Sequence, residues 1–165
     1  NVQSTEKEKE RALDSFETFS TTIRERTYGI DPVKVELLDP SLLLFVEDFR
    51  LREEDLKLLD NEVQKADVML VDPSGSSVAT YDLAARYKKP VVIAWGLNCR
   101  TVDISAYCRS KGLEVFIPDS VSGIEDIMTL LRARKILSQT RISSSSSEDA
   151  MTMLLPRSEI WLTIL

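Results

Sequence analysis

ADVMLVDPSGSSVATYDLAARYKKPVVIAWGLNC, residues 66–99, decides the fold class of this chain. Val68–Val71 and Val91–Ala94 are short apolar runs of the kind found in strands that are buried on both faces. Between them, Ser77–Tyr87 has its apolar residues at helical spacing, and Pro90 ends the helical pattern. This order predicts a strand–helix–strand unit whose two strands are parallel.

The same alternation of strands and helices continues on both sides of this unit. The predicted elements are a helix over 5–28, a strand over Val33–Leu38, a strand or extended segment over Leu42–Val46, a helix over Glu53–Lys65, a helix over Val102–Lys111, a strand over Val115–Ile117 and a helix over Ser122–Leu137. Such alternation predicts an α/β domain over residues 1–142, with a three-layer, doubly wound parallel sheet of the flavodoxin or Rossmann type. A first strand before Thr5 is missing from this pattern.

Helix ends are marked by local signals. Thr101 is a good N-cap for the helix that follows it, and Ser122–Glu125 has the spacing of a capping box. Arg132–Lys135 is a basic cluster, which we expect in the last turns of its helix, where cations complement the helix dipole. Lys88–Lys89 is interpreted as a solvated helix end.

Residues 143–165 are expected to form a serine-rich linker and an irregular tail. Ser143–Ser147 is a serine run typical of flexible linkers, and Glu148–Leu165 has apolar patches without clear periodicity. Our hypothesis is that the native reading ends near Ile142 and that the remainder is a truncated, spliced or frame-shifted end.

Composition excludes several classes of function. The sequence has no histidine, which removes the usual general base and the commonest transition-metal ligand. A net charge of −6 argues against a nucleic-acid partner. No apolar run is long enough for a transmembrane helix. Cys99 and Cys108 lack metal or disulfide spacing, so we expect reduced thiols in a cytoplasmic protein.

The candidate site lies at the carboxyl ends of the two strands of the central unit, where parallel sheets collect ligands. Ser74, Gly75 and Ser76 follow the first strand, and Asn98 and Arg100 follow the second. Hydroxyls, an amide and a guanidinium can all form hydrogen bonds to a ligand. The competing structural interpretation is a tight turn with a serine that caps the next helix, together with an asparagine and an arginine that shape a loop and cap a helix.

Three further positions admit a chemical role beside a structural one. Glu47–Asp48 pairs two carboxylates but fits a solvated strand end, and Trp95 suits either the core or stacking on a sugar. Cys99 precedes a helix but has no partner base. No catalytic residue and no metal ligand is assigned.

Four segments give the chain a resemblance to a known family. Phe45–Arg50, Arg86–Val92, Cys99–Pro118 and Leu130–Ile142 resemble the N-terminal region of the L-fucose/L-arabinose isomerase-like sugar isomerases. The resemblance covers roughly residues 33–142 and is a pattern over several segments rather than one diagnostic motif.

The resemblance implies the N-terminal domain of an aldose–ketose isomerase of carbohydrate metabolism. In that family the reaction uses a divalent metal, usually Mn²⁺, held by Glu, Asp and His of later domains, and the N-terminal domain borders the sugar pocket and the subunit interface of a homo-oligomer. None of those ligand positions is in this sequence. Aldose–ketose isomerisation needs a base and a metal or an acid, which a chain without histidine or convergent carboxylates does not supply. We therefore expect this chain to be inactive alone and to hold no cofactor of its own. The resemblance also implies that Ser74, Gly75, Ser76, Asn98 and Arg100 bind a sugar-like small molecule.

Two alternatives remain open. The central stretch also resembles the nucleoside 2-deoxyribosyltransferase and TIR-like group, in which a Glu on the helix after the loop is the nucleophile. The nearest carboxylate here is Asp82, and Val78-Ala79 stands where that group has Gly-Thr. The other alternative is a non-catalytic oligomerisation module.

Overall fold

The computed structural model describes residues 2–26, 34–43, 51–73, 76–94, 96–139 and 158–164. Their elements are, in chain order, α1 (Val2–Arg24), β1 (Val35–Leu37), β2 (Ser41–Leu42), α2 (Glu53–Lys65), β3 (Val68–Asp72), α3 (Ser77–Tyr87), β4 (Val91–Ile93), α4 (Cys99–Ser110), β5 (Val115–Phe116), α5 (Val121–Gln139) and β6 (Ser158–Ile164).

The strands form one parallel sheet in the order β1-β6-β3-β4-β5. Met69 to Val71 of β3 pair with Val91 to Ile93 of β4, as expected for a strand–helix–strand unit. The predicted α/β class with a parallel sheet is therefore confirmed. β1 and β2 follow each other along β6, because both strands pair with it in parallel.

β6 is the main departure from the sequence analysis. Ser158–Ile164 forms a parallel strand between β1 and β3, so the expectation of an irregular tail is wrong for these residues. The error has a physical cause. A strand with partners on both sides carries a continuous apolar run rather than alternation, and Ile160–Leu162 is such a run but lies close to the charged Arg157 and Glu159.

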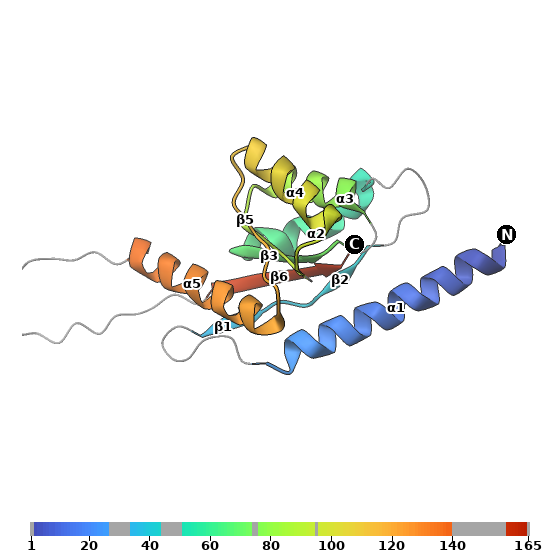
Figure 1. The fold of residues 1–165 in the computed structure, drawn as a ribbon, viewed down its shortest axis with the longest axis horizontal. Coiled ribbons are helices and arrows are strands. Elements are labelled where there is room, and N and C mark those ends of the chain that lie inside the picture. Colours follow the sequence, from blue (N-terminus) through green and yellow to red (C-terminus); the bar gives the residue numbers. More distant parts are fainter. Residues whose placement is uncertain are drawn as a thin grey trace, which may run out of the picture.

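Two hydrophobic clusters lie on the two faces of the sheet. Successive side chains of a strand point to opposite faces, so Met69 and Val71 face α2, α3 and α4, whereas Val68 and Leu70 face α1 and α5. In Figure 1, α3 and α4 lie above the strands, whereas α1 runs below them. Burial of these faces supplies most of the stabilising free energy.

Two helix starts differ from the predicted ones. Asn98, rather than Thr101, is the N-cap of α4, which therefore begins three residues earlier than the predicted cap allows. Ser120, rather than Ser122, receives the hydrogen bond at the start of α5: its Oγ accepts from the Gly123 N–H at 3.0 Å. In both cases two cap-forming residue types lie within one turn, and local propensity does not choose between them.

Lys88 and Lys89, which follow α3, also differ from the solvated helix end that the sequence predicts. Lys88 takes the left-handed conformation at the end of α3, with φ 53°, and its N–H donates to Ala84 O. Lys89 is not a solvated helix end. Its ammonium donates to the carbonyl oxygens of Val63 (2.6 Å), Gln64 (2.9 Å) and Ala66 at the end of α2.

Candidate functional site

A pocket of about 360 Å³ opens at the carboxyl ends of β3 and β4. It is lined by Asp72, Pro73, Ala94, Asn98, Cys99, Arg100 and Thr101. This is the edge of the sheet at which the sequence analysis placed the candidate site. The volume lies within the range of pockets that hold small molecules.

Asn98 and Thr101 shape the pocket wall through a capping box. The Asn98 side-chain oxygen accepts from the N–H groups of Arg100 and Thr101, both at 3.0 Å. The Thr101 hydroxyl accepts from the Asn98 N–H at 2.9 Å and donates to Gly96 O at 2.8 Å. The structural interpretation of Asn98 therefore holds, since this oxygen fixes the start of α4.

Arg100 joins the two loops of the site. Its Nη1 donates to Pro73 O at 2.8 Å, which ties the first turn of α4 to the segment that follows β3. Asp72, the last residue of β3, is only 5% exposed and lies at the base of this segment. The guanidinium thus connects the two segments that border the pocket.

Ser76 acts as a helix cap. Its buried Oγ accepts from the Ala79 N–H at 3.1 Å at the start of α3, and Ser76 does not line the pocket. Ser74 and Gly75 lie outside the described residues. The structure therefore brings together Asn98 and Arg100 of the predicted site and assigns Ser76 to the local geometry of α3.

The sequence analysis did not select four other lining residues, which are Asp72, Pro73, Ala94 and Thr101. Asp72 had a usable signal, because it is the first polar residue after the apolar run of β3. Cys99 had been weighed as a nucleophile. Cys99 is the first residue of α4, and it is exposed in the pocket wall.

A tyrosine–aspartate pair joins α3 to α4 beside this edge. The Tyr81 hydroxyl donates to the Asp103 carboxylate, and the Tyr81 ring stacks on Tyr107 with centroids 4.3 Å apart. Burial of the phenol, with the neighbouring Asp103 charge, raises the pKa of Tyr81 to about 12. The phenol therefore stays neutral at physiological pH and serves as a hydrogen-bond donor.

Three further candidates from the sequence analysis are Asp82, Trp95 and the pair Glu47–Asp48. Asp82 lies on α3 and is half-buried. Trp95 and Glu47–Asp48 lie outside the described residues.

The donor set does not suit Mn²⁺. Among the described residues there is no group of three or more His, Cys, Asp and Glu side chains placed to hold a metal ion. The pocket lining has one carboxylate, that of Asp72, and the sequence has no histidine. Hard divalent cations require several oxygen or imidazole ligands, so this pocket does not fit the metal.

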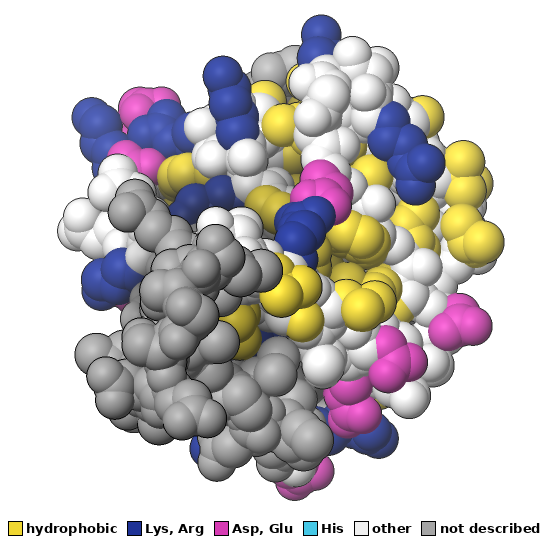
Figure 2. Space-filling model, turned by 90° about the vertical axis from the view of Figure 1, so that its left-hand side faces the viewer, with side chains coloured by type: hydrophobic (Ala, Val, Ile, Leu, Met, Phe, Trp, Pro, Cys, Tyr) yellow, Lys and Arg dark blue, Asp and Glu magenta, His cyan; other side chains and the backbone are white. Residues whose placement is uncertain are grey.

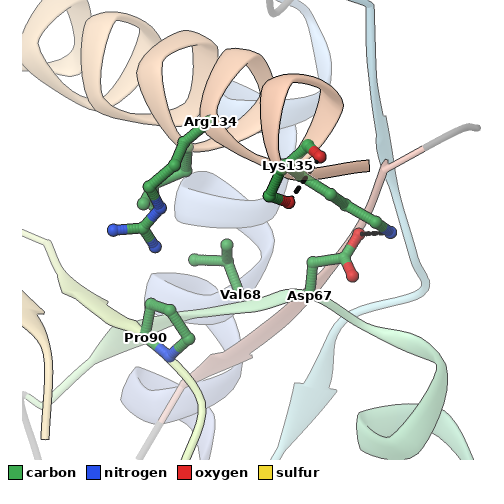
Figure 3. A pocket seen from close by; sticks show the side chains of 7 residues that line it. Asp67, Val68, Pro90, Arg134 and Lys135 are labelled. Atoms are coloured by element: carbon green, nitrogen blue, oxygen red, sulfur yellow. Dashed lines mark hydrogen bonds and ion pairs between the residues drawn. The ribbon is translucent and has the colours of Figure 1, made fainter. Parts of the chain in front are cut away.

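A second pocket of about 320 Å³ lies at the opposite edge of the sheet, under α5. Val68 and Pro90 form its floor, and Lys135 reaches toward Asp67, with Nζ 2.6 Å from Oδ2 (Figure 3). Arg134 makes two contacts with the Glu114 carboxylate, at 2.5 and 2.8 Å.

These ion pairs correct the interpretation of the basic cluster Arg132–Lys135. α5 continues to Gln139, and its last turn has no basic residue. Arg134 and Lys135 therefore bind carboxylates of neighbouring loops instead of complementing the end of the helix.

Some large apolar side chains remain at the surface. Figure 2 shows hydrophobic side chains gathered on one face of the molecule, with charged side chains among them. Among the residues whose burial the structure describes, the large hydrophobic ones with high exposure are Leu13, Leu58, Leu97, Val102, Leu130 and Leu137. None of the described helices combines the length and apolar character that crossing a bilayer requires.

Comparison with known proteins gives no family for this chain. No family model, curated protein or solved structure matches it. The pocket at the ends of β3 and β4 therefore has to be interpreted from its own residues.

Proposed function

We propose that this chain is the ligand-binding N-terminal α/β domain of an aldose–ketose isomerase, bordering the sugar pocket and inactive by itself. The observation that carries the proposal is the pocket at the carboxyl ends of β3 and β4, which has Arg100 on its wall. Open parallel sheets bind their ligands at this edge. The resemblance over residues 33–142 supplies the reaction class.

The strand order supports a doubly wound, three-layer fold of the flavodoxin type. With β6 in the place of a first strand, the order β1-β6-β3-β4-β5 corresponds to the flavodoxin-like order 2-1-3-4-5. In that arrangement the order of the strands reverses between β6 and β3, and the loop after β3 borders the ligand site at this switch point.

The parent enzyme would supply the catalytic machinery. Moving a proton between adjacent carbons requires a base and an acid or metal that stabilises the enediolate. Since the residues lining this pocket do not fit Mn²⁺, we place the metal ligands in other parts of a homo-oligomeric parent. Cys99 and Cys108 are free thiols, which supports a cytoplasmic location.

Sugar binding by the purified chain tests the proposal. We expect saturation-transfer NMR to detect weak, saturable binding of at least one of L-arabinose, L-fucose and D-ribose. Arg100→Gln should weaken that binding about tenfold, because it removes a charged hydrogen-bond donor from the pocket wall. Arg109→Gln, an exposed change later in α4, is the matched control and should leave binding unaltered.

Activity assays separate this proposal from its alternative. The chain with added Mn²⁺ should show no aldose–ketose turnover, and measurable turnover would contradict inactivity of the isolated domain. Release of free base from 2′-deoxynucleosides, abolished by Asp82→Asn, would instead establish N-glycosidic transfer. Absence of binding for all three sugars would reject the sugar-binding function.

A further inference from the structure

One side of α5 packs on the sheet, and the opposite side carries a stripe with the spacing of a coiled-coil seam. Residues three and four positions apart lie on the same face of an α-helix. Along α5, four residues follow one another at such steps, and they are Asp126, Leu130, Ala133 and Leu137. We call these residues the outer stripe.

Both leucines of the outer stripe are exposed. Leu130 is 68% exposed and Leu137 is 73% exposed. Single exposed leucines are common at protein surfaces, but these two lie on one seam with the small Ala133 between them, so they form an apolar strip. A second helix that covered this strip would remove it from water and thereby stabilise the association.

The charges along α5 fit a second copy of the same helix. Asp126 lies about one turn before Leu130, and Arg134 lies about one turn after it, beside the outer stripe. A second copy that runs antiparallel reverses this order, so the carboxylate of each helix comes next to the guanidinium of the other. Charges beside a seam set the choice and the orientation of the partner helix, and these favour an antiparallel copy.

Both charged side chains can reach a partner outside the chain. Asp126 is exposed, and no ion pair joins it to another residue in the part of the chain that the structure describes. The Arg134 side chain is 55% exposed although its Nη1 and Nη2 donate to Glu114. A guanidinium has more N–H donors than these two contacts use, so Arg134 can bind a second carboxylate.

We infer that this chain forms a two-fold symmetric dimer in which α5 packs antiparallel against α5 of a second copy. Leu130 of each helix lies against Ala133 of the other, so a large side chain meets a small one. The ion pair between Asp126 and Arg134 occurs twice, because a two-fold axis relates the helices. This surface goes beyond the proposed sugar site, whose lining contains no residue of α5.

Sedimentation equilibrium of the full chain tests the dimer. We expect a reversible equilibrium between monomer and dimer. Leu130→Gln should raise the dissociation constant about tenfold, because it replaces the central apolar contact of the seam with a polar group. Leu58→Gln is the matched control, since Leu58 is 79% exposed on α2, which covers the other face of the sheet. It should leave the dissociation constant unchanged.

Charge reversal tests the antiparallel orientation. Asp126→Lys and Arg134→Glu each bring like charges together in an antiparallel dimer, so each variant alone should dimerise about tenfold more weakly. An equimolar mixture of the two variants should form a heterodimer with the original affinity, because every reversed charge then meets an opposite one. Parallel helices already bring like charges together without any substitution, so single reversals would not weaken their association.

The outcomes decide each part of the inference. A chain that stays monomeric up to millimolar concentration overturns it and leaves the outer stripe to a different protein. A dimer that Leu130→Gln weakens no more than Leu58→Gln does forms through another surface. Single reversals without effect, or a mixture that gives no heterodimer, overturn the antiparallel pairing. Sugar binding is measured separately by NMR, so its failure bears on the proposed function alone.

Discussion

At the scale of single residues, Lys88 carries a backbone conformation that favours glycine. It lies at φ 53° and ψ 31° at the end of α3, where its N–H closes the last turn on Ala84 O at 3.0 Å. A side chain with a Cβ is strained in this region, whereas glycine is not. Helices commonly end on glycine in this conformation for the same reason.

Lys88→Gly is therefore expected to stabilise the protein. The relief of strain exceeds the entropy that glycine adds to the unfolded chain, and the free energy of unfolding should rise by about 0.5–1 kcal/mol. Urea denaturation measures the change. Lys88→Ala removes the same side chain but keeps the Cβ, so it should leave stability nearly unaltered. Equal stability of the two variants would contradict the strain argument.

At this scale the sequence predicted two residues of the pocket but did not predict the N-cap of α4 or the contacts of Lys89. Asn98 and Arg100 were selected as candidate site residues, and both line the pocket. The assignment of the N-cap to Thr101 was wrong, because Asn98 and Thr101 cap the helix reciprocally and only the backbone path decides which comes first. Lys89 gave no signal in the sequence, since its carbonyl partners are more than 20 residues away.

At the scale of elements, Lys89 joins the end of α2 to the start of β4. Three carbonyl groups that the helix itself leaves without partners accept from its ammonium. The positive charge also faces the negative end of the helix dipole. This contact fixes α2 against the strand–helix–strand unit.

Lys89→Met should therefore lower the free energy of unfolding by about 1–2 kcal/mol, because a side chain of similar length loses the charge-assisted hydrogen bonds. Thermal unfolding followed by circular dichroism gives the measurement. Lys57→Met, an exposed change on α2 itself, is the control with the same change of charge. A loss of stability no greater than that of the control would show that the cap contributes nothing.

Element types were predictable wherever the pattern was local. The bounds of α2 were predicted as Glu53–Lys65 and are confirmed, because its buried residues Leu56, Leu59 and Val63 follow the helical period. β1 and β5 are shorter than predicted, at Val35–Leu37 and Val115–Phe116. Strand ends depend on partners in the sheet, which the local sequence does not contain.

At the scale of the whole molecule, β6 connects two parts of the sheet. β1 and β2 pair with it on one side and β3 on the other, so without β6 the row β3-β4-β5 would not contact β1. The position of β6 was not predictable from sequence. Its pairing with β3 joins residues about 90 positions apart, and no local pattern reports such a contact.

Leu162→Pro tests the central position of β6. Proline removes a backbone donor and does not fit a strand with neighbours on both sides, so the free energy of unfolding should fall by about 3 kcal/mol or more. Leu162 lies opposite Leu70 in the register. Chemical denaturation measures the loss, with Leu162→Val, which keeps the backbone donor at the same position, as the control. Equal stability of the two variants would contradict a central β6.

The register of β6 also has a practical consequence. Ile164 pairs with Asp72, and Asp72 lines the pocket, so the carboxyl end of β6 arrives at the rim where a guest molecule would enter. A solvent-sensitive fluorophore coupled to a cysteine that replaces Ile164 would therefore change its emission when that rim is occupied. The carboxyl end of β6 thus provides an attachment point for an optical sensor of occupancy.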